Sequence, residues 1–257
     1  MKRTIRSAAA VMAAVMAMSC ASATAFADSA KANGFVIADM TNDIQGGWNI
    51  NTSSTAMSKN AKAKAAFEKV TENINGVTYE PIAVLGTQVV SGSNYAVLCR
   101  KTPSNPSAAS QVVVMYIYVS LDGNAKLTGF KTVIDESEKN GYIVNTGKFA
   151  ISNRKNRTVY NTYRKAVKDV NGVTYKPVLY MGKRKESGSN YMLLCRTKDA
   201  SSDASYQWSI VTVNRSASGK AKLTATKTLA LGETDGDNYS DDSDISAADF
   251  GIVDIKM

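Results

Sequence analysis

The sequence predicts an α+β protein made of two tandem domains, each with one helix packed on a four-stranded antiparallel sheet. Three observations lead to this fold class: a repeat of domain size, one amphipathic helix in each copy, and four β-rich segments separated by turn sequences. The chain has 257 residues, which is room for two ordinary domains, and its apolar content of 44% is enough to form a core.

The repeat is free of gaps over residues 75–132. When each residue n is aligned with residue n+96, 25 of the 58 pairs are identical. The runs Asn75–Tyr79 and Ser91–Tyr95 return as Asn171–Tyr175 and Ser187–Tyr191. The period is the length of a domain, so the copies are two domains rather than solenoid units. We place them at 44–135 and 139–232, with the short link 136–138 between them.

Each copy begins with a helix whose apolar residues recur every three or four positions. In the first copy this stripe consists of Ala63, Ala66, Phe67, Val70 and Ile74. Ser58 is the expected N-cap, and Asn75-Gly76 supplies a left-handed stop. In the second copy the stripe consists of Val159, Tyr163, Ala166, Val167 and Val170, and Asn171-Gly172 ends the helix.

Four strands follow each helix. In the first copy they are expected at 81–90, 94–101, 111–120 and 125–134. Two turn sequences, Ser91-Gly92-Ser93 and Asp122-Gly123-Asn124, separate them into hairpins. A short leading segment precedes each helix, and there Gly47-Trp48 aligns with Gly141-Tyr142 at an offset of 94. We expect Trp48 to anchor this segment in the core.

The first 27 residues are typical of a secretory signal. Lys2, Arg3 and Arg6 precede an apolar stretch, and Ala25-Phe26-Ala27 matches the small-x-small cleavage pattern. The apolar run is too short to favour a permanent membrane span. We therefore expect a secreted protein, extracellular or associated with the cell surface and not transmembrane, with residues 28–43 as a linker. In the alternative, Cys20 is the lipidated residue of a lipoprotein.

Composition argues against an enzyme. The chain contains no histidine, which removes the commonest general base and metal ligand, and no paired-carboxylate pattern replaces it. Cys99 and Cys195 have no histidine to act as the base that would activate a nucleophilic thiol. We interpret them as buried thiols, and the alternative is a disulfide between the domains. No cofactor is expected.

Charge is unevenly distributed. Residues 139–232 carry 18 Lys and Arg against four Asp and Glu, a net charge of +14, whereas residues 44–135 carry a net +3. The acidic tail, 233–257, has a net charge of −7. The basic domain could bind an anionic surface polymer, or the charge could serve only solubility. Nucleic acid is not an expected partner, because no stacking or groove-reading motif is present.

The tail also contains a weak calcium-loop pattern. The residues at the ligand positions are Asn238, Ser240, Asp242, Asp244, Ser246 and Asp249. This run resembles half of a dockerin repeat, although Ser243 stands where the pattern has glycine. A disordered acidic tail is the default interpretation.

The first hairpin resembles that of the cystatins, the family of cysteine protease inhibitors. Its pattern Gln-x-Val-x-Gly is matched by Gln88, Val90 and Gly92, and Gly46-Gly47 stands where the family has a glycine before its first strand. The resemblance implies a helix wrapped by an antiparallel sheet and a wedge that plugs the cleft of a papain-like cysteine protease. The protease-binding residues that it implies are Gly46, Gly47, Gln88, Val89, Val90, Ser91, Gly92, Leu121, Asp122 and Gly123.

The second copy departs from this pattern, because its hairpin reads Lys183-Arg184-Lys185-Glu186 and charges are costly to bury in a cleft. The hypothesis is thus a secreted inhibitor that acts through its first domain. The alternative is a non-inhibitory exported binding module, in which Val89 and Val90 are ordinary strand residues and the basic second domain attaches to an anionic cell-envelope or surface polymer.

Overall fold

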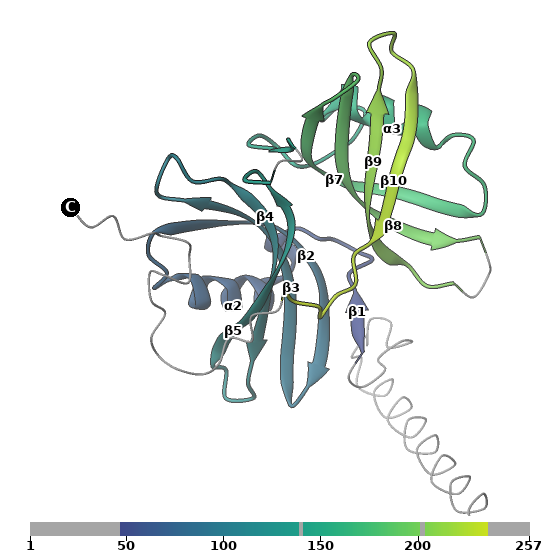
Figure 1. Cartoon of the computed structure of the whole chain (residues 1–257). Helices are drawn as coiled ribbons and strands as arrows, with labels where there is room; N and C mark the ends of the chain where they lie inside the picture. The colour runs from purple at the N-terminus through teal and green to yellow at the C-terminus, as the bar shows by residue number, and fades with distance from the viewer. Residues whose placement is uncertain (1–46, 139–140, 201–203, 236–257) are drawn as a thin grey trace, which may run out of the picture. The chain divides into compact units, whose positions relative to one another are not determined.

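The structure, a computed structural model, describes residues 47–138, 141–200 and 204–235. Over these residues the protein is mostly β, with two five-stranded antiparallel sheets and two α-helices (Figure 1). The first copy consists of β1 (Trp48–Ile50), the 3-10 helix η1 (Met57–Lys59), α2 (Ala61–Thr71), β2 (Val77–Val90), β3 (Gly92–Pro103), β4 (Gln111–Val119) and β5 (Ala125–Asp135). The second consists of β6 (Ile143–Val144), α3 (Arg157–Val167), β7 (Val173–Lys185), β8 (Ser189–Asp199), β9 (Gln207–Arg215) and β10 (Ala221–Thr228).

The predicted fold class, an α+β protein with a four-stranded sheet in each copy, is wrong. Each sheet has a fifth strand, β1 or β6, formed by the leading segment before the helix, and the protein is predominantly β. β1 pairs with β2 from Trp48↔Gln88 to Ile50↔Gly86, and β6 pairs with β7 at Ile143↔Lys183. These strands are three and two residues long, too short to show the alternation of apolar and polar residues that identifies a strand.

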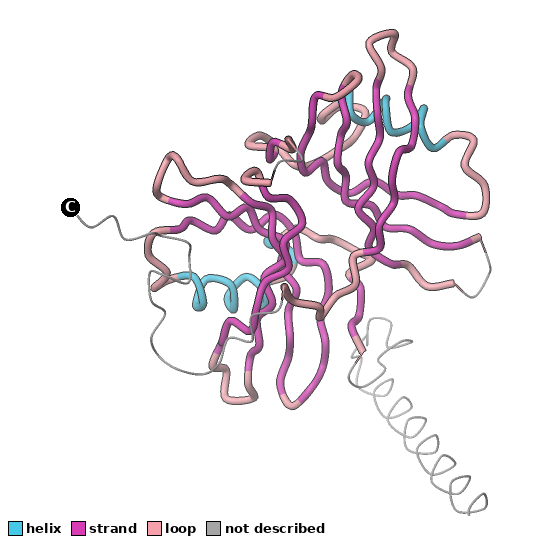
Figure 2. Tube along the Cα trace, viewed as in Figure 1, coloured by secondary structure: helices cyan, strands magenta, loops and turns pink. Residues whose placement is uncertain are grey.

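Neighbouring strands in each sheet are consecutive in sequence. The orders are β1-β2-β3-β4-β5 and β10-β9-β8-β7-β6, and every pair is antiparallel. Figure 2 shows the strands joined by loops and turns. Asn51 and Asn145 occupy equivalent places after β1 and β6. The backbone N–H of each donates to the adjacent strand, Asn51 to the Leu85 carbonyl and Asn145 to the Met181 carbonyl, both at 2.8 Å. The repeat in the sequence is therefore a repeat in backbone hydrogen bonding.

Each helix covers one face of its own sheet. The predicted stripe of α2 is confirmed at Ala63, Ala66 and Phe67, which are buried against the sheet. The same is true of Val159 and Tyr163 in α3. The predicted N-cap at Ser58 is wrong, because that residue lies in η1. Asn60 occupies the N-cap position, and its side-chain amide donates to the carbonyls of Ser54 and Ala56, both at 2.8 Å.

A second layer of buried side chains joins the two copies. Leu85, Leu98 and Tyr116 of the first sheet belong to the same apolar cluster as Met181 and Trp208 of the second. The buried Trp208 indole N–H donates to the Leu85 carbonyl at 2.8 Å. The faces of the sheets that the helices leave uncovered therefore contribute to one shared core.

After β10 the chain returns to the first copy. The Leu229 N–H donates to the Trp208 carbonyl at 2.8 Å, and the Asp235 N–H donates to the Phe130 carbonyl at 3.0 Å. The Asp235 carboxylate also lies 3.4 Å from Lys131 Nζ. This return segment, 229–235, contacts both copies and so reinforces their association.

None of the helices among the described residues combines the length and apolar character needed to cross a membrane.

Candidate functional site

Three segments that the sequence pointed to come together at one end of the first sheet. Trp48, at the start of β1, lies opposite Gln88, two residues before the end of β2. In the neighbouring pair, Ser93 at the start of β3 lies opposite Val119 at the end of β4. The tips of the β2–β3 and β4–β5 hairpins are therefore neighbours, and Figure 1 shows both at the lower end of this sheet. We call Gly47, the β2–β3 tip and the β4–β5 tip together the hairpin edge. Gly46 lies outside the described residues.

The hairpin edge exposes large apolar side chains. Val89 is 53% exposed, Val90 38% and Leu121 86%. Within the described ranges, the fourth exposed side chain of this kind is Ile143, on β6. Three of four such residues thus lie on two adjacent hairpin tips. Val89 and Val90 are consecutive in β2, so their side chains project to opposite faces of the first tip.

The first hairpin tip is held rigidly. Gly92 has φ of +128°, and a Cβ placed there would lie 2.3 Å from the Val119 carbonyl oxygen, so only glycine fits. The Tyr118 hydroxyl donates to the Ser91 carbonyl at 2.5 Å, which ties the tip to β4. The Gln88 side-chain carbonyl accepts from the Asn94 amide at 2.6 Å. Tyr118 was not identified from the sequence, because its contact depends on the pairing of β3 with β4.

Asp122 organises the second tip. Its carboxylate accepts hydrogen bonds from the Ser120 hydroxyl and, at 2.6 Å, from the Asn124 amide. These bonds hold the pKa of the Asp122 carboxyl below its usual value, the bond from Ser120 being the largest cause. The Gly123 N–H closes the turn by donating to the Ser120 carbonyl at 3.0 Å. Leu121, in the same turn, is exposed to solvent. The role of Asp122 in the structure is therefore to fix the conformation of the turn that presents Leu121.

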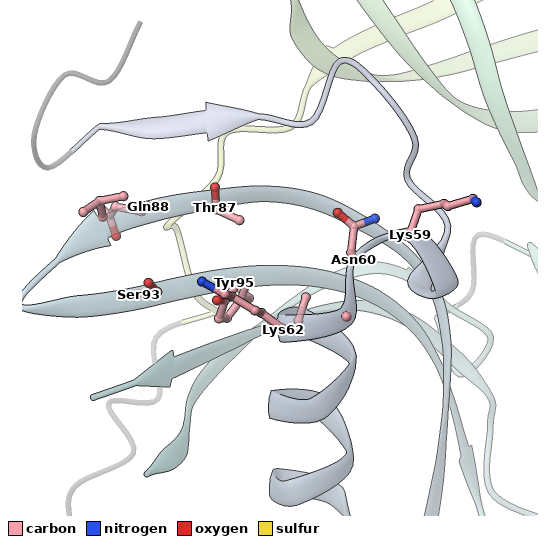
Figure 3. A pocket seen from close by; sticks show the side chains of 10 residues that line it. Lys59, Asn60, Lys62, Thr87, Gln88, Ser93 and Tyr95 are labelled. Carbon is pink, nitrogen blue, oxygen red and sulfur yellow. The ribbon is translucent and has the colours of Figure 1, made fainter. Parts of the chain in front are cut away.

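A groove of about 360 Å³ lies beside the first hairpin (Figure 3). One wall comes from the end of η1 and the start of α2, with Lys59, Asn60 and Lys62, and the other comes from β2 and β3, with Gln88 and Tyr95. Its lining is mixed, with two ammonium groups and several apolar atoms. Val89 itself lines this groove, so one of the exposed valines borders it.

The equivalent hairpin of the second copy has the same turn and a different surface. Gly188 has φ of +112°, and a Cβ there would lie 2.2 Å from the Arg215 carbonyl oxygen. Arg184 pairs with Glu186 at 2.5 Å and lies over the Tyr142 ring, 5.0 Å from its centroid. The charged side chains of this tip are therefore partly engaged with one another, and no large apolar side chain is exposed between Lys183 and Glu186.

The cysteines are not candidates for catalysis. Cys99 and Cys195 are both free and fully buried, which confirms their interpretation as buried thiols. They lie in separate clusters, each beneath the helix of its own copy, so the alternative of a disulfide between them is wrong. Burial raises the pKa of both thiols. A thiol that stays protonated in an apolar core is a poor nucleophile.

The possible calcium-loop residues, Asn238, Ser240, Asp242, Asp244, Ser246 and Asp249, lie outside the described residues. So do the signal, the linker and Cys20. In the part of the chain that the structure describes, no group of three Asp, Glu, Cys or His residues is close enough to hold a metal ion.

A comparison with known protein families finds none whose pattern matches this chain. A comparison with curated proteins also finds no match.

Proposed function

We propose that this protein is an exported inhibitor of papain-like cysteine proteases and that its hairpin edge is the inhibitory surface. The observation that carries the proposal is the gathering of Val89, Val90 and Leu121, all exposed, on two neighbouring hairpin tips. The resemblance of Gln88, Val90 and Gly92 to the cystatin pattern adds the class of target. The beginning of β1, opposite Gln88, adds the third segment that the resemblance requires.

The physical chemistry of the edge suits insertion into a narrow cleft. Valine and leucine bring apolar area with no charge to desolvate, so burial of these tips is favourable. Both tips are fixed by hydrogen bonds, from Tyr118 to Ser91 in the first and from Ser120 and Asn124 to Asp122 in the second. A loop that is already ordered loses little conformational entropy when it binds.

The same features explain how such an inhibitor would escape cleavage. A hairpin tip held by its neighbouring strand cannot extend into the conformation of a substrate without breaking its turn. Gly92, with its positive φ, keeps the chain bent at the point of closest approach. The edge would therefore block the cleft on both sides of the catalytic cysteine without entering the reaction.

The test is inhibition of papain by the purified protein, measured with a fluorogenic peptide substrate. We expect an inhibition constant below about 1 µM, within the range of protein interfaces of ordinary size. The double variant Val89→Asp/Val90→Asp should raise this constant at least about 100-fold, because two carboxylates would be buried without partners.

Lys185→Asp is the matched control, since Lys185 is the counterpart of Val89 in the second copy. It should change the inhibition constant less than about threefold, and so should a change from 50 to 500 mM salt, because apolar contacts are not screened. Papain left fully active at tens of micromolar protein would contradict the proposal. Equal inhibition by the parent and the double variant would also contradict the role of the hairpin edge.

A further inference from the structure

The second copy has a groove beside its β9–β10 turn, the counterpart of the β4–β5 tip in the first copy. It lies between α3 and the β9–β10 turn and has a volume of about 330 Å³. The helix contributes Thr158, Asn161, Thr162 and Lys165, which are spaced along one face, and the turn contributes Arg215, Ser218 and Gly219. Apart from Gly219 the lining residues are all polar, and they include two cations and no carboxylate.

The corresponding region of the first copy has different residues and less positive charge. At the equivalent positions, 96 residues earlier, Val119 and Asp122 stand where the second copy has Arg215 and Ser218. Lys69, the counterpart of Lys165, donates to the Gly123 carbonyl at 3.0 Å. In the first copy the lysine is thus hydrogen-bonded to the turn, the turn contains an acidic residue, and valine stands in place of the second cation.

The β9–β10 turn keeps its shape without a carboxylate. The Ser216 hydroxyl accepts from the Lys220 N–H at 3.1 Å and lies 3.0 Å from the Ser218 hydroxyl. The turn is further closed by the Gly219 N–H, which donates to the Ser216 carbonyl at 2.9 Å. A hydroxyl has therefore taken over the structural role of Asp122, and the groove has lost the negative charge that this role brought to the first copy.

The two cations of the groove are not neutralised locally. Lys165 and Arg215 are exposed, and neither forms an ion pair with another residue of the described part of the chain. The surrounding copy carries a net charge of +14, which raises the positive potential over the groove. An arginine fork, a lysine ammonium and hydroxyl donors together suit the oxygens of a tetrahedral anion.

We propose that this groove binds phosphate groups, either free or carried by an anionic polymer. Arg215 and Lys165 would pair with the phosphate oxygens from opposite walls, and Ser218 and Asn161 would donate hydrogen bonds from the turn and the helix. The proposal is independent of protease inhibition, since it involves other residues on the other copy. It would give the protein a means of attachment to a phosphate-bearing surface.

The test is titration of the 15N-labelled protein with inorganic phosphate and with sodium polyphosphate at 50 mM salt, followed by amide chemical shifts and by calorimetry. We expect the largest shifts at Asn161, Ser218 and Gly219 with at least one probe. Shifts with both probes would indicate recognition of the phosphate group itself, and shifts with polyphosphate alone would indicate recognition of a polymer. No shift near the groove with either probe would overturn the proposal.

The discriminating variant is Arg215→Val/Ser218→Asp, which gives the groove the residues of the first copy and lowers the net charge by two. We expect it to weaken binding at least about tenfold, because Arg215→Val removes a charge-assisted pair with the phosphate and Ser218→Asp adds a carboxylate that repels it. The control is Lys176→Ser/Lys227→Ser, which removes the same net charge at exposed positions outside the groove. It should weaken binding less than about threefold. Equal weakening by both variants would show that the net charge binds anions diffusely, and would overturn the groove as a site.

Discussion

The β2–β3 and β7–β8 hairpins have nearly the same backbone and opposite surfaces. Gly92 and Gly188 both take a positive φ, and each faces a carbonyl oxygen of the next strand at a distance that admits no Cβ. Ahead of these glycines stand Val89-Val90 in one copy and Lys185-Glu186 in the other. The glycine of the cystatin-like pattern is thus required by the fold in both copies, and only the residues before it differ in what they could bind.

The same contrast holds at the second turn of each sheet. Leu121 and Asp122 in the first copy correspond to Ala217 and Ser218 in the second. The first copy has an apolar tip beside an acidic turn, whereas the second has a small, uncharged turn beside two cations. The two copies therefore share the backbone of this turn and differ in the side chains that it carries.

The largest effect that we predict concerns the shared glycines. Gly92→Ala and Gly188→Ala should each lower the free energy of unfolding by about 3 kcal/mol, because strain at positive φ adds to a collision with a backbone oxygen. Denaturant unfolding followed by circular dichroism measures the change. Gly123→Ala is the control, since that glycine also has a positive φ but has open space around it; it should cost about 1 kcal/mol. A loss confined to Gly92 would refute the idea that both hairpins obey one constraint.

A smaller effect is predicted for the second tip. Leu121→Asp should weaken papain inhibition at least about tenfold, equivalent to about 1.4 kcal/mol, because the exposed leucine would no longer contribute apolar area to the interface. Ala217→Asp, at the corresponding place in the second copy, should leave the inhibition constant within about threefold. If both substitutions weaken inhibition equally, the division of function between the copies is wrong.

Transfer of the apolar tip sharpens the comparison further. In protein that carries Val89→Asp/Val90→Asp, the changes Arg184→Gln, Lys185→Val and Glu186→Val give the second hairpin the residues of the first. We expect inhibition to recover at least about threefold, because the backbone that presents these side chains is common to both copies. Absence of any recovery, with folding unchanged by circular dichroism, would mean that the tips differ in more than their side chains.

The smallest predicted effect is local and depends on pH. The folded pKa of Asp122 is lowered, so its contribution to the β4–β5 turn is present above the unfolded value of about 3.9 and is lost as the pH falls through the folded value. Amide hydrogen exchange at Gly123 should therefore accelerate, relative to its intrinsic rate, as the solution is acidified in that range. Gly219 should not respond, because Ser218 does not titrate. A parallel response at both glycines would point to general acid unfolding instead.

Local patterns identified most of the individual elements. The apolar stripe predicted at Ala63, Ala66 and Phe67 is buried, and the four strands predicted in the first copy lie close to their predicted ranges. These signals are local, because helix periodicity and turn residues act over a few positions. Ser58 was a plausible cap by the same logic, yet the chain turns through η1 and begins its helix after Asn60. Which residue becomes the N-cap depends on the path of the preceding segment, whose Ser54 and Ala56 carbonyls accept hydrogen bonds from the Asn60 side chain.

The candidate site was predicted only in part. The sequence indicated Gln88 to Gly92 through a family pattern and Leu121 to Gly123 as a turn. It gave no means of knowing that Tyr118 would tie the first tip to β4, or that Leu121 would be 86% exposed. Exposure is a property of what packs around a residue, so it follows from strand register and from neighbours that are distant in sequence.

The sequence by itself determined that there are two copies, where their helices and hairpins lie, and how charge is divided between them. Only the tertiary structure decided that each sheet has a fifth strand, that the uncovered faces of both sheets join in one core around Trp208, and that the return segment contacts the first copy. The physical reason is the range of the interactions. β1 pairs with β2 across an intervening helix, and the Trp208 N–H bonds to Leu85 across 123 residues, so neither contact leaves a periodic trace in the local sequence.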